Sequence, residues 1–373
     1  MKGYGYAIFE ETVFGGALAL LSSGALAAGA TILGYPAPIQ KEFKNWQVTC
    51  NNLNTCQLNN YAERYSYQYV ILKRDAGASG KISLSILLKP DQQAVYLDGT
   101  PFPLDAADWQ IDNESDGDGK FYRYTTRLEV IQRFIQAARN AQQLALVEQP
   151  ATREVEDGDV VSLNGLSAAL LLADERQGRL KNRSALLNIG EGDVSQVPPV
   201  PTGQRVDITY HQPEPLSNGD VLAAAVSKAH QSVLCEPDEG EKSSEKLEAF
   251  PLSGKLALVM RKCSPGAYQG ASDLFITPRN NPQAAKPVKL LALSISNAAL
   301  VEMEEGPMGV KYEPQTGLLS HTVLVSSICG SGEGASWAFD GKAFQLVSYS
   351  FSSVCARRKD WPSVWAMPGY PTE

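Results

Sequence analysis

The chain lacks the motifs that mark the common enzyme classes. It contains no Cys-x-x-Cys redox pair, no Gly-rich phosphate loop, no dinucleotide fingerprint and no Gly-x-Ser-x-Gly nucleophile elbow. A Ser-His-Asp arrangement would need His321 with Ser320 or Ser326 and Asp340, and proximity in sequence does not establish that geometry. Paired carboxylates for glycoside hydrolysis stay open, because they can come from any part of a chain. These absences favour a protein that is not an enzyme and needs no cofactor.

Metal ligands are also scarce. There are only three histidines, and His321 alone lies near a cysteine, eight positions before Cys329. The segment Asp112–Gly119 follows the first seven positions of a calcium loop, but its twelfth position is Arg123 instead of a bidentate Glu. We therefore expect an acidic hairpin tip there, with a weak calcium site as the alternative, and we expect no metal centre.

Positive charge is in deficit. The chain has 33 Lys and Arg against 41 Asp and Glu, a net charge of −8. Binding to nucleic acid or to an anionic membrane surface needs clustered Lys and Arg, so neither is expected. After the N-terminus no apolar run approaches the ~20 residues of a transmembrane helix, which excludes an integral membrane segment once a signal is removed.

The N-terminal residues 1–28 resemble a signal peptide. An apolar, small-residue stretch runs from Thr12 to Ala30 and contains Ala25-Leu26-Ala27, an A-x-A-like cleavage site. The basic n-region is weak, since Lys2 is its only positive residue. A membrane anchor is the alternative. Export predicts a periplasmic protein, with secretion as the other destination.

Six cysteines agree with an oxidising compartment. They fall in three neighbouring pairs, Cys50/Cys56, Cys235/Cys263 and Cys329/Cys355. Pairing neighbours is the simplest of the 15 connectivities that six cysteines allow, and all 15 stay open from the sequence. We expect three disulfides, as is common in exported proteins.

The length of the chain and its many Gly and Pro residues, which mark turns and linkers, suggest an α+β chain with two β-rich domains and a few packing helices. The first domain is expected over 38–193, a Pro-rich linker over 194–204 and a second, disulfide-stapled domain over 205–368. Period-2 alternation predicts a strand from Ile82 to Leu88. Helical spacing of apolar residues predicts helices over 127–140, 164–177 and 219–231, with Asn164 as the N-cap of the second and Gly178 after its end.

The stretch from Ser327 to Trp365 predicts a β-hairpin that closes the second domain. Asp340-Gly341 marks its turn, and apolar alternation follows to Cys355. Aromatic side chains here and in the preceding turn are candidates for stacking on a ligand: Tyr268, Trp337 and Trp361. Packing inside the hairpin is the alternative for the tryptophans.

These landmarks resemble a proteobacterial envelope family known only as a domain of unknown function. Its members share a Trp-x-x-x-Cys start, a Cys-x-x-Gly-Ala-Tyr turn, a Cys-Gly before a Trp-x-Trp-Asp-Gly hairpin, a further Cys and a final Trp-Pro. The matching residues here are Trp46 to Cys50, Cys263 to Tyr268, Cys329-Gly330, Trp337 to Gly341, with Phe339 in place of the second Trp, Cys355 and Trp361-Pro362. The first half is also similar to invasion-associated locus B proteins. The resemblance implies an exported protein and supplies no catalytic residues.

Three functions therefore remain. The first is a non-enzymatic periplasmic protein that binds an envelope or host protein or glycan, which predicts an exposed aromatic patch near Trp361 or Tyr268. The second is an enzyme acting on peptidoglycan or another envelope polymer, which requires a cleft that holds His321 or an acidic pair. The third is an inhibitor of a foreign hydrolase such as lysozyme.

Overall fold

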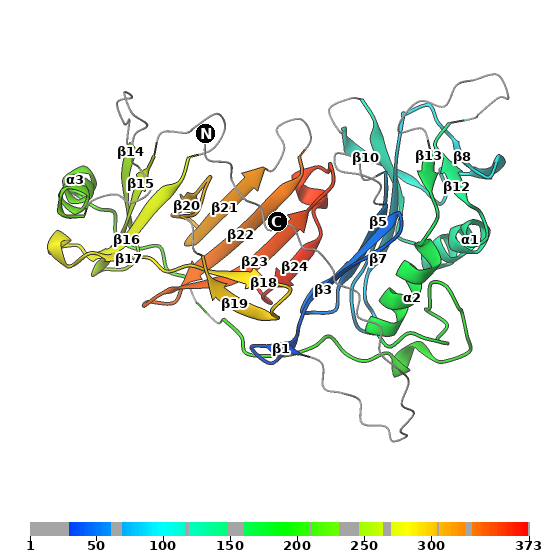
Figure 1. Ribbon diagram of the computed structural model, residues 1–373, viewed down its shortest axis with the longest axis horizontal. Coiled ribbons are helices and arrows are strands. Elements are labelled where there is room, and N and C mark those ends of the chain that lie inside the picture. Colours follow the sequence, from blue (N-terminus) through cyan, green and yellow to red (C-terminus); the bar gives the residue numbers. More distant parts are fainter. Residues whose placement is uncertain are drawn as a thin grey trace, which may run out of the picture.

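The computed structural model describes residues 30–60, 69–115, 119–147, 160–206, 208, 210–230, 246–263, 270–303, 306–324 and 330–371. Figure 1 shows two lobes side by side, a first half built mainly from residues up to 206 and a second half built from the residues that follow. Strands predominate, and the described residues contain three α-helices. The expectation of a β-rich chain with a few helices is confirmed at this level.

A seven-stranded antiparallel sheet forms the centre of the first half. In sheet order its strands are β10 (Gln110–Ser115), β11 (Phe121–Thr125), β7 (Ile82–Leu88), β6 (Val70–Arg74), β5 (Cys56–Asn60), β4 (Trp46–Cys50) and β3 (Ile39–Phe43). A smaller sheet has the order β13 (Val160–Ser162), β12 (Gln143–Ala145), β8 (Ala94–Leu97) and β9 (Thr100–Pro103). In β7 every second residue from Ile82 is buried, as the alternating sequence predicts.

Two helices pack against these sheets. α1 (Leu128–Ala138) buries its apolar face at Val130, Ile131, Phe134, Ile135 and Ala138. Each of the four larger side chains contributes roughly 1.5–3 kcal/mol when fully buried. α2 (Leu166–Arg176) begins one residue later than expected, because its N-cap is Gly165 and not Asn164. Gly165 has φ +98°, and a Cβ there would lie 1.7 Å from the carbonyl oxygen of Phe43. Gly178, with φ +64°, follows the helix as predicted.

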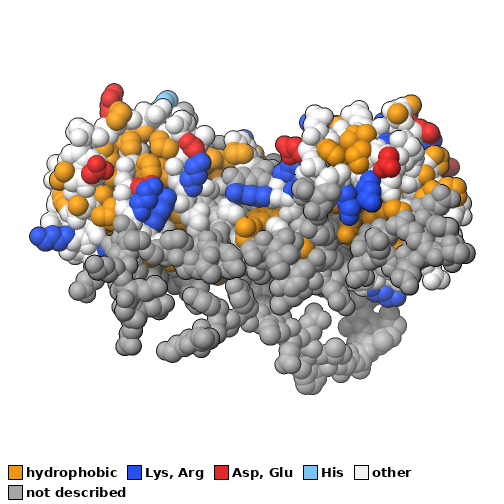
Figure 2. Space-filling model, turned by 90° about the horizontal axis from the view of Figure 1, so that it is seen from above, with side chains coloured by type: hydrophobic (Ala, Val, Ile, Leu, Met, Phe, Trp, Pro, Cys, Tyr) orange, Lys and Arg blue, Asp and Glu red, His pale blue; other side chains and the backbone are white. Residues whose placement is uncertain are grey.

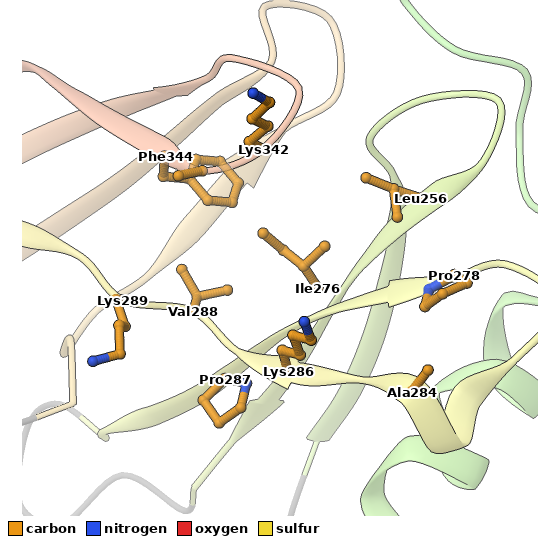
Figure 3. Close-up of a pocket in the computed structure, with 11 residues that line it drawn as sticks. Leu256, Ile276, Pro278, Ala284, Lys286, Pro287, Val288, Lys289, Lys342 and Phe344 are labelled. Carbon is orange, nitrogen blue, oxygen red and sulfur yellow. The ribbon is translucent and has the colours of Figure 1, made fainter.

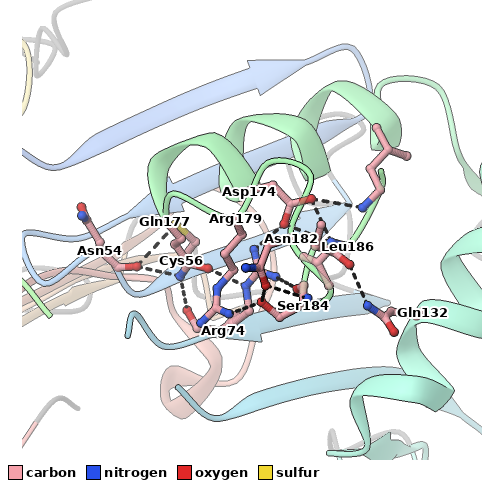
Figure 4. A network of polar contacts seen from close by, with 12 residues as sticks. Asn54, Cys56, Arg74, Gln132, Asp174, Gln177, Arg179, Asn182, Ser184 and Leu186 are labelled. Carbon is pink, nitrogen blue, oxygen red and sulfur yellow. Dashed lines mark hydrogen bonds and ion pairs between the residues drawn. The ribbon is translucent and has the colours of Figure 1, made fainter. Parts of the chain in front are cut away.

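A buried polar network fastens α2 to the large sheet (Figure 4). Arg74 of β6 donates from Nη2 to the Asp174 carboxylate at 2.6 Å and from Nη1 to the Ser184 carbonyl at 3.0 Å. The same carboxylate accepts from the backbone N–H of Leu186 at 2.8 Å. Burial is the main cause that lowers the pKa of Arg74, and the Asp174 charge opposes it. Because Arg74, Asp174 and Ser184 are buried and bonded to one another, we interpret the network as structural.

The second half contains three further sheets. A four-stranded sheet has the order β14 (Lys246–Pro251), β15 (Leu256–Lys262), β16 (Ser272–Pro278) and β17 (Lys286–Pro287). α3 (Gly219–Ala229) covers one face of it through Leu222, Ala223 and Val226. β18 (Leu291–Ser294) pairs with β19 (Ala299–Glu302). A five-stranded sheet has the order β20 (Lys311–Glu313), β21 (Leu318–Leu324), β22 (Gly332–Phe339), β23 (Phe344–Ser352) and β24 (Ser363–Ala366).

The expected hairpin is the pair β22 and β23, which run antiparallel on either side of the Asp340-Gly341 turn. A bulge lies between Ser336 and Trp337. The first residues of the described chain also join this half: β1 (Thr31–Ile32) and β2 (Tyr35–Pro36) form a short ribbon, and the Tyr35 ring lies edge-on to Trp365 at 5.9 Å. The second-half core therefore contains residues that precede position 38.

The two halves meet at β24, the edge strand of the five-stranded sheet. The fully buried Asn52 donates from Nδ2 to the Ala366 carbonyl at 2.9 Å, and its Oδ1 accepts from the Ala366 N–H at 2.8 Å. One side-chain amide thus occupies the backbone groups that would otherwise be open to another strand. Gln57 adds a 2.8 Å bond to the carbonyl of Asp360.

Acidic residues of β10 provide a second contact between the halves. Asp112 accepts from Arg357 at 3.0 Å, and Glu114 forms an ion pair with Lys359 at 2.5 Å. Burial raises the pKa of Asp112, but the hydrogen bond from Arg357 and the neighbouring donors outweigh it and leave this pKa below its usual value. The β10–β11 pair confirms the hairpin expected around this acidic run, although residues 116–118 lie outside the described residues.

One disulfide is described, Cys50–Cys56, between the neighbouring ends of β4 and β5. Cys263 and Cys355 are not free thiols. Their expected partners, Cys235 and Cys329, lie outside the described residues, as does the expected signal peptide, residues 1–28. The pairing Cys235–Cys263 and Cys329–Cys355 stays a prediction, and so do the domain boundaries and the linker over 194–204.

Candidate functional site

An apolar pocket of about 410 Å³ lies where the four-stranded sheet of the second half meets the turn between β22 and β23 (Figure 3). Small-molecule sites commonly have volumes of roughly 300–1,000 Å³, so the pocket has the size of a small-ligand site. Two distant parts of the sequence form it, residues 256–289 and residues 342–344.

Strand alternation explains the apolar wall. Phe275 belongs to the α3 side of the sheet, whereas Ile276 belongs to the side that faces the five-stranded sheet. Ile276 is only half-buried, so its side chain meets the pocket instead of being covered by the core. Eight apolar residues line the cavity: Leu256, Ile276, Pro278, Ala284, Pro287, Val288, Ala343 and Phe344.

The turn between β22 and β23 is held in place by Asp340. Its Oδ1 accepts from the N–H groups of Lys342 and Ala343, both at 2.8 Å, and Gly341 takes the positive φ of +96° that the turn needs. Burial raises the pKa of Asp340, but these backbone donors outweigh it and leave the pKa below its usual value. The Asp340 carboxylate thus stabilises the turn, and the turn presents Lys342 and Phe344 to the pocket.

The remaining lining residues are three lysines, Lys286, Lys289 and Lys342, and no carboxylate lines the pocket. Lys289 pairs with Glu302 at 3.0 Å, but both side chains are largely exposed, so the pair is weak. In the described part of the chain Lys286 and Lys342 have no ion-pair partner. Figure 3 shows the Lys286 side chain directed toward Ile276, while the ammonium ends of Lys289 and Lys342 point away from the apolar side chains. In a chain with a net charge of −8, this is a local excess of positive charge.

His321 lies in a separate polar cluster on three neighbouring strands. Its Nδ1 donates to the Met308 carbonyl at 2.8 Å, and its Nε2 lies 3.3 Å from Glu333, which also accepts from the Tyr349 hydroxyl at 2.7 Å. The hydrogen bond from His321 is the main cause that lowers the pKa of Glu333, with burial opposing it. Burial and the Glu333 charge raise the pKa of Tyr349 well above its usual value.

This cluster does not meet the condition set for an enzyme site around His321. The histidine is 3% exposed, lies edge-on to Trp337, and has partners at both ring nitrogens. Neither Ser320 nor Asp340 is its partner: Ser320 donates to the Lys311 carbonyl, and Asp340 holds the hairpin turn. The structure thus favours the structural role for this residue, and Ser326 lies outside the described residues.

Two of the three candidate stacking residues, Trp337 and Trp361, are buried and do not form an exposed aromatic patch. Trp337 is 0% exposed and donates to the Leu291 carbonyl at 2.8 Å, and Trp361 is 3% exposed and donates to the Gly330 carbonyl at 2.6 Å. Burial with a satisfied indole N–H is the packing alternative that the sequence left open. Tyr268 lies outside the described residues. The binding role of these three residues stays a prediction, and the patch expected near Trp361 is not found on the described surface.

The lysines of the pocket were missed by sequence reasoning. Lys286-Pro287-Val288-Lys289 is a short basic segment, and Lys342 follows a turn glycine. Each is ordinary alone, and only the packing of the hairpin turn against β16 and β17 brings them to one cavity.

One face of the molecule has a mixed surface character. The face shown in Figure 2 carries hydrophobic, basic and acidic side chains interspersed. Within the described residues no helix is long and apolar enough to cross a membrane, and no group of three His, Cys, Asp or Glu is placed to hold a metal ion. The Lys-rimmed pocket is therefore the feature we carry forward as the candidate site.

Comparison with known proteins gives a family without an assigned activity. The chain is 28% identical over 352 residues to "Uncharacterized protein YpfG" of Escherichia coli (strain K12), a match that covers 90% of this chain and 95% of the relative. No solved structure matches significantly. The expected similarity to invasion-associated locus B proteins is shown neither by this relative nor by the family match, and it stays a prediction. Residues 40–368 match the family model described as "Protein of unknown function (DUF1176)", and the chain belongs to that family.

Proposed function

We propose that the protein is an exported, non-enzymatic binding protein of the bacterial envelope and that the Lys-rimmed pocket is its ligand site. The pocket carries the proposal, because it has the size and apolar lining of a small-ligand site. The signal-like N-terminus and the use of cysteine support export. The buried state of Trp361 argues for a ligand in this pocket over a partner stacked on the predicted aromatic patch.

Binding is tested with an uncharged, environment-sensitive dye such as Nile red. We expect saturable fluorescence enhancement that Val288→Asn weakens, because the polar amide enters the apolar wall. The matched control is Val301→Asn, at an exposed valine of β19 outside the pocket. Equal dye binding by both variants, at unchanged melting temperatures, would contradict the assignment of the site.

Export is tested separately. Expressed from its full sequence in a Gram-negative host, the protein should be recovered from the periplasm, and N-terminal sequencing should show removal of about 28 residues. Recovery of the uncleaved chain in the cytoplasmic fraction would refute this part. The lysozyme-inhibitor alternative also stays a prediction, which an inhibition assay with purified lysozyme decides.

A further inference from the structure

We propose that the pocket binds a single acyl chain that ends in a carboxylate, a free fatty acid. This inference rests on the proposed function and names the ligand class of the same site. The apolar wall would take the chain, and the lysines at its rim would take the anion. A hydrophobic body with one charged end matches a lining of eight apolar residues and three lysines without a carboxylate.

The volume limits the ligand to one chain. A cavity of about 410 Å³ lies near the lower end of the range for small-ligand sites, so a two-chain phospholipid is too large to be enclosed. Strands and a turn form the walls of the cavity. β15 and β16 lie on one side, β17 on another, and the β22–β23 turn above. These walls are held by the ladders between β15, β16 and β17 and by the Asp340 bonds in the turn.

The pocket lacks the donors that give many phosphate sites their geometric specificity. Phosphate sites commonly use arginine forks or backbone N–H groups at helix N-termini. No arginine lines this pocket, and the only helical residue there, Ala284, ends the three-residue turn η2 (Pro282–Ala284). Lysines on flexible stems supply point charges, and the rim lysines can turn their ammonium groups toward an anion without moving the backbone.

Charge complementarity gives an affinity difference that can be measured. Lys286 and Lys342 line the pocket and form no salt bridge among the described residues, and the charge of Lys342 acts on the nearby Asp340 carboxylate without a direct ion pair. An anion can therefore gain contacts with both lysines without breaking a salt bridge. Two exposed charge pairs increase affinity by about 2- to 30-fold in total. Each methylene that becomes fully buried adds up to about fourfold.

The test is calorimetric titration with dodecanoate, methyl dodecanoate, dodecyl phosphate and dodecyltrimethylammonium, all below their micelle concentrations. We expect dodecanoate to bind about tenfold more tightly than the ester at low salt, and the difference to shrink in ~1 M NaCl, where the Debye length falls to about 3 Å. Across octanoate, decanoate and dodecanoate, affinity should rise with length and then level off when the cavity is full.

The variants separate the charge from the fold. Lys286→Gln/Lys342→Gln should bring dodecanoate binding down to that of the ester, while leaving ester binding unchanged. The control, Lys228→Gln/Lys311→Gln, removes the same charge from exposed positions on α3 and β20, outside the pocket, and should change neither. Melting temperatures of both double variants should match the wild type.

Each alternative outcome is distinguishable. Equal binding of dodecanoate and its ester, or equal losses in the two double variants, would overturn the carboxylate assignment and leave the proposed function standing. Tighter binding of dodecyl phosphate or of the ammonium amphiphile would overturn it as well. If Nile red binds but no amphiphile does, the acyl ligand is wrong. If neither the dye nor any amphiphile binds, the proposed function fails too. This is the result expected if a segment of the chain itself fills the pocket.

Discussion

Replacing Asn52 with alanine should destabilise the protein strongly, because one amide satisfies two backbone groups of the edge strand β24. The substitution removes the 2.9 Å bond to the Ala366 carbonyl and the 2.8 Å bond from the Ala366 N–H. Ala366 is itself buried, so both groups would be left without these partners inside the protein. An unsatisfied buried polar group costs about 1–3 kcal/mol, which gives about 2–6 kcal/mol for the pair. Water that enters the vacated space would bring the loss toward the lower end.

The loss is measurable by urea unfolding followed by tryptophan fluorescence, and by calorimetry. In domains of 150–250 residues a loss of 1 kcal/mol lowers the melting temperature by about 2–4 °C, so a decrease of at least about 4 °C is expected. Asn297→Ala, at an exposed position between β18 and β19, is the control and should stay within about 0.5 kcal/mol of the wild type. A loss below 1 kcal/mol for Asn52→Ala would refute the reasoning that this amide closes the contact between the halves.

Three further predictions concern other buried contacts. Arg74→Met should cost about 3–5 kcal/mol, because it removes the cation that forms an ion pair with the buried Asp174 carboxylate, and replacing both members with apolar residues should recover much of that loss in urea unfolding; a loss below 1 kcal/mol would contradict this. Opening the Cys50–Cys56 bridge by a double Ala substitution should cost about 2 kcal/mol in the loop-entropy model, and an unchanged melting temperature would argue against it. Since the pKa of Glu333 is depressed in the folded state, chiefly by the hydrogen bond from His321, its stabilising effect is present above the unfolded pKa of about 4.3 and disappears as pH falls through the lower folded value. Glu333→Gln should therefore be less stable than the wild type at pH 7, with the difference shrinking below about pH 4; a constant difference across that range would refute this coupling.

The periodicity of apolar residues predicted individual helices and strands better than it predicted the contacts between them. The alternation of Ile82 to Leu88 and the apolar face of α1 follow directly from periodicity, and both are confirmed. The N-cap of α2 was misplaced by one residue because the close approach of Phe43 to Gly165 is a tertiary constraint that no local pattern contains. Propensity favours Asn at an N-cap, but here the position has φ +98° and no room for a side chain.

The candidate site was less accessible to sequence reasoning than the fold. Aromatic residues attract attention as ligand contacts, yet Trp337 and Trp361 have their indole N–H groups bonded to backbone carbonyls inside the protein. The contact between Asn52 and Ala366 joins residues 314 positions apart, and the pocket joins Lys286 to Lys342. These contacts between distant residues depend on how the sheets pack, and the periodicity of apolar residues along the sequence carries no information about that packing.

The β22–β23 hairpin connects the contact between the two halves with the candidate pocket. β23 has nine residues, an extended length of about 30 Å. One end of the β22–β23 pair lies beside Trp361 and the contact with the first half, where Ser353 accepts from Gln47. The other end is the turn that supplies Lys342 and Phe344 to the pocket. Because side chains alternate along a strand, a register shift of one residue would turn Phe344 away from the cavity. The register between β22 and β23, in which Phe339 pairs with Phe344, therefore fixes which side chains the turn presents to the pocket.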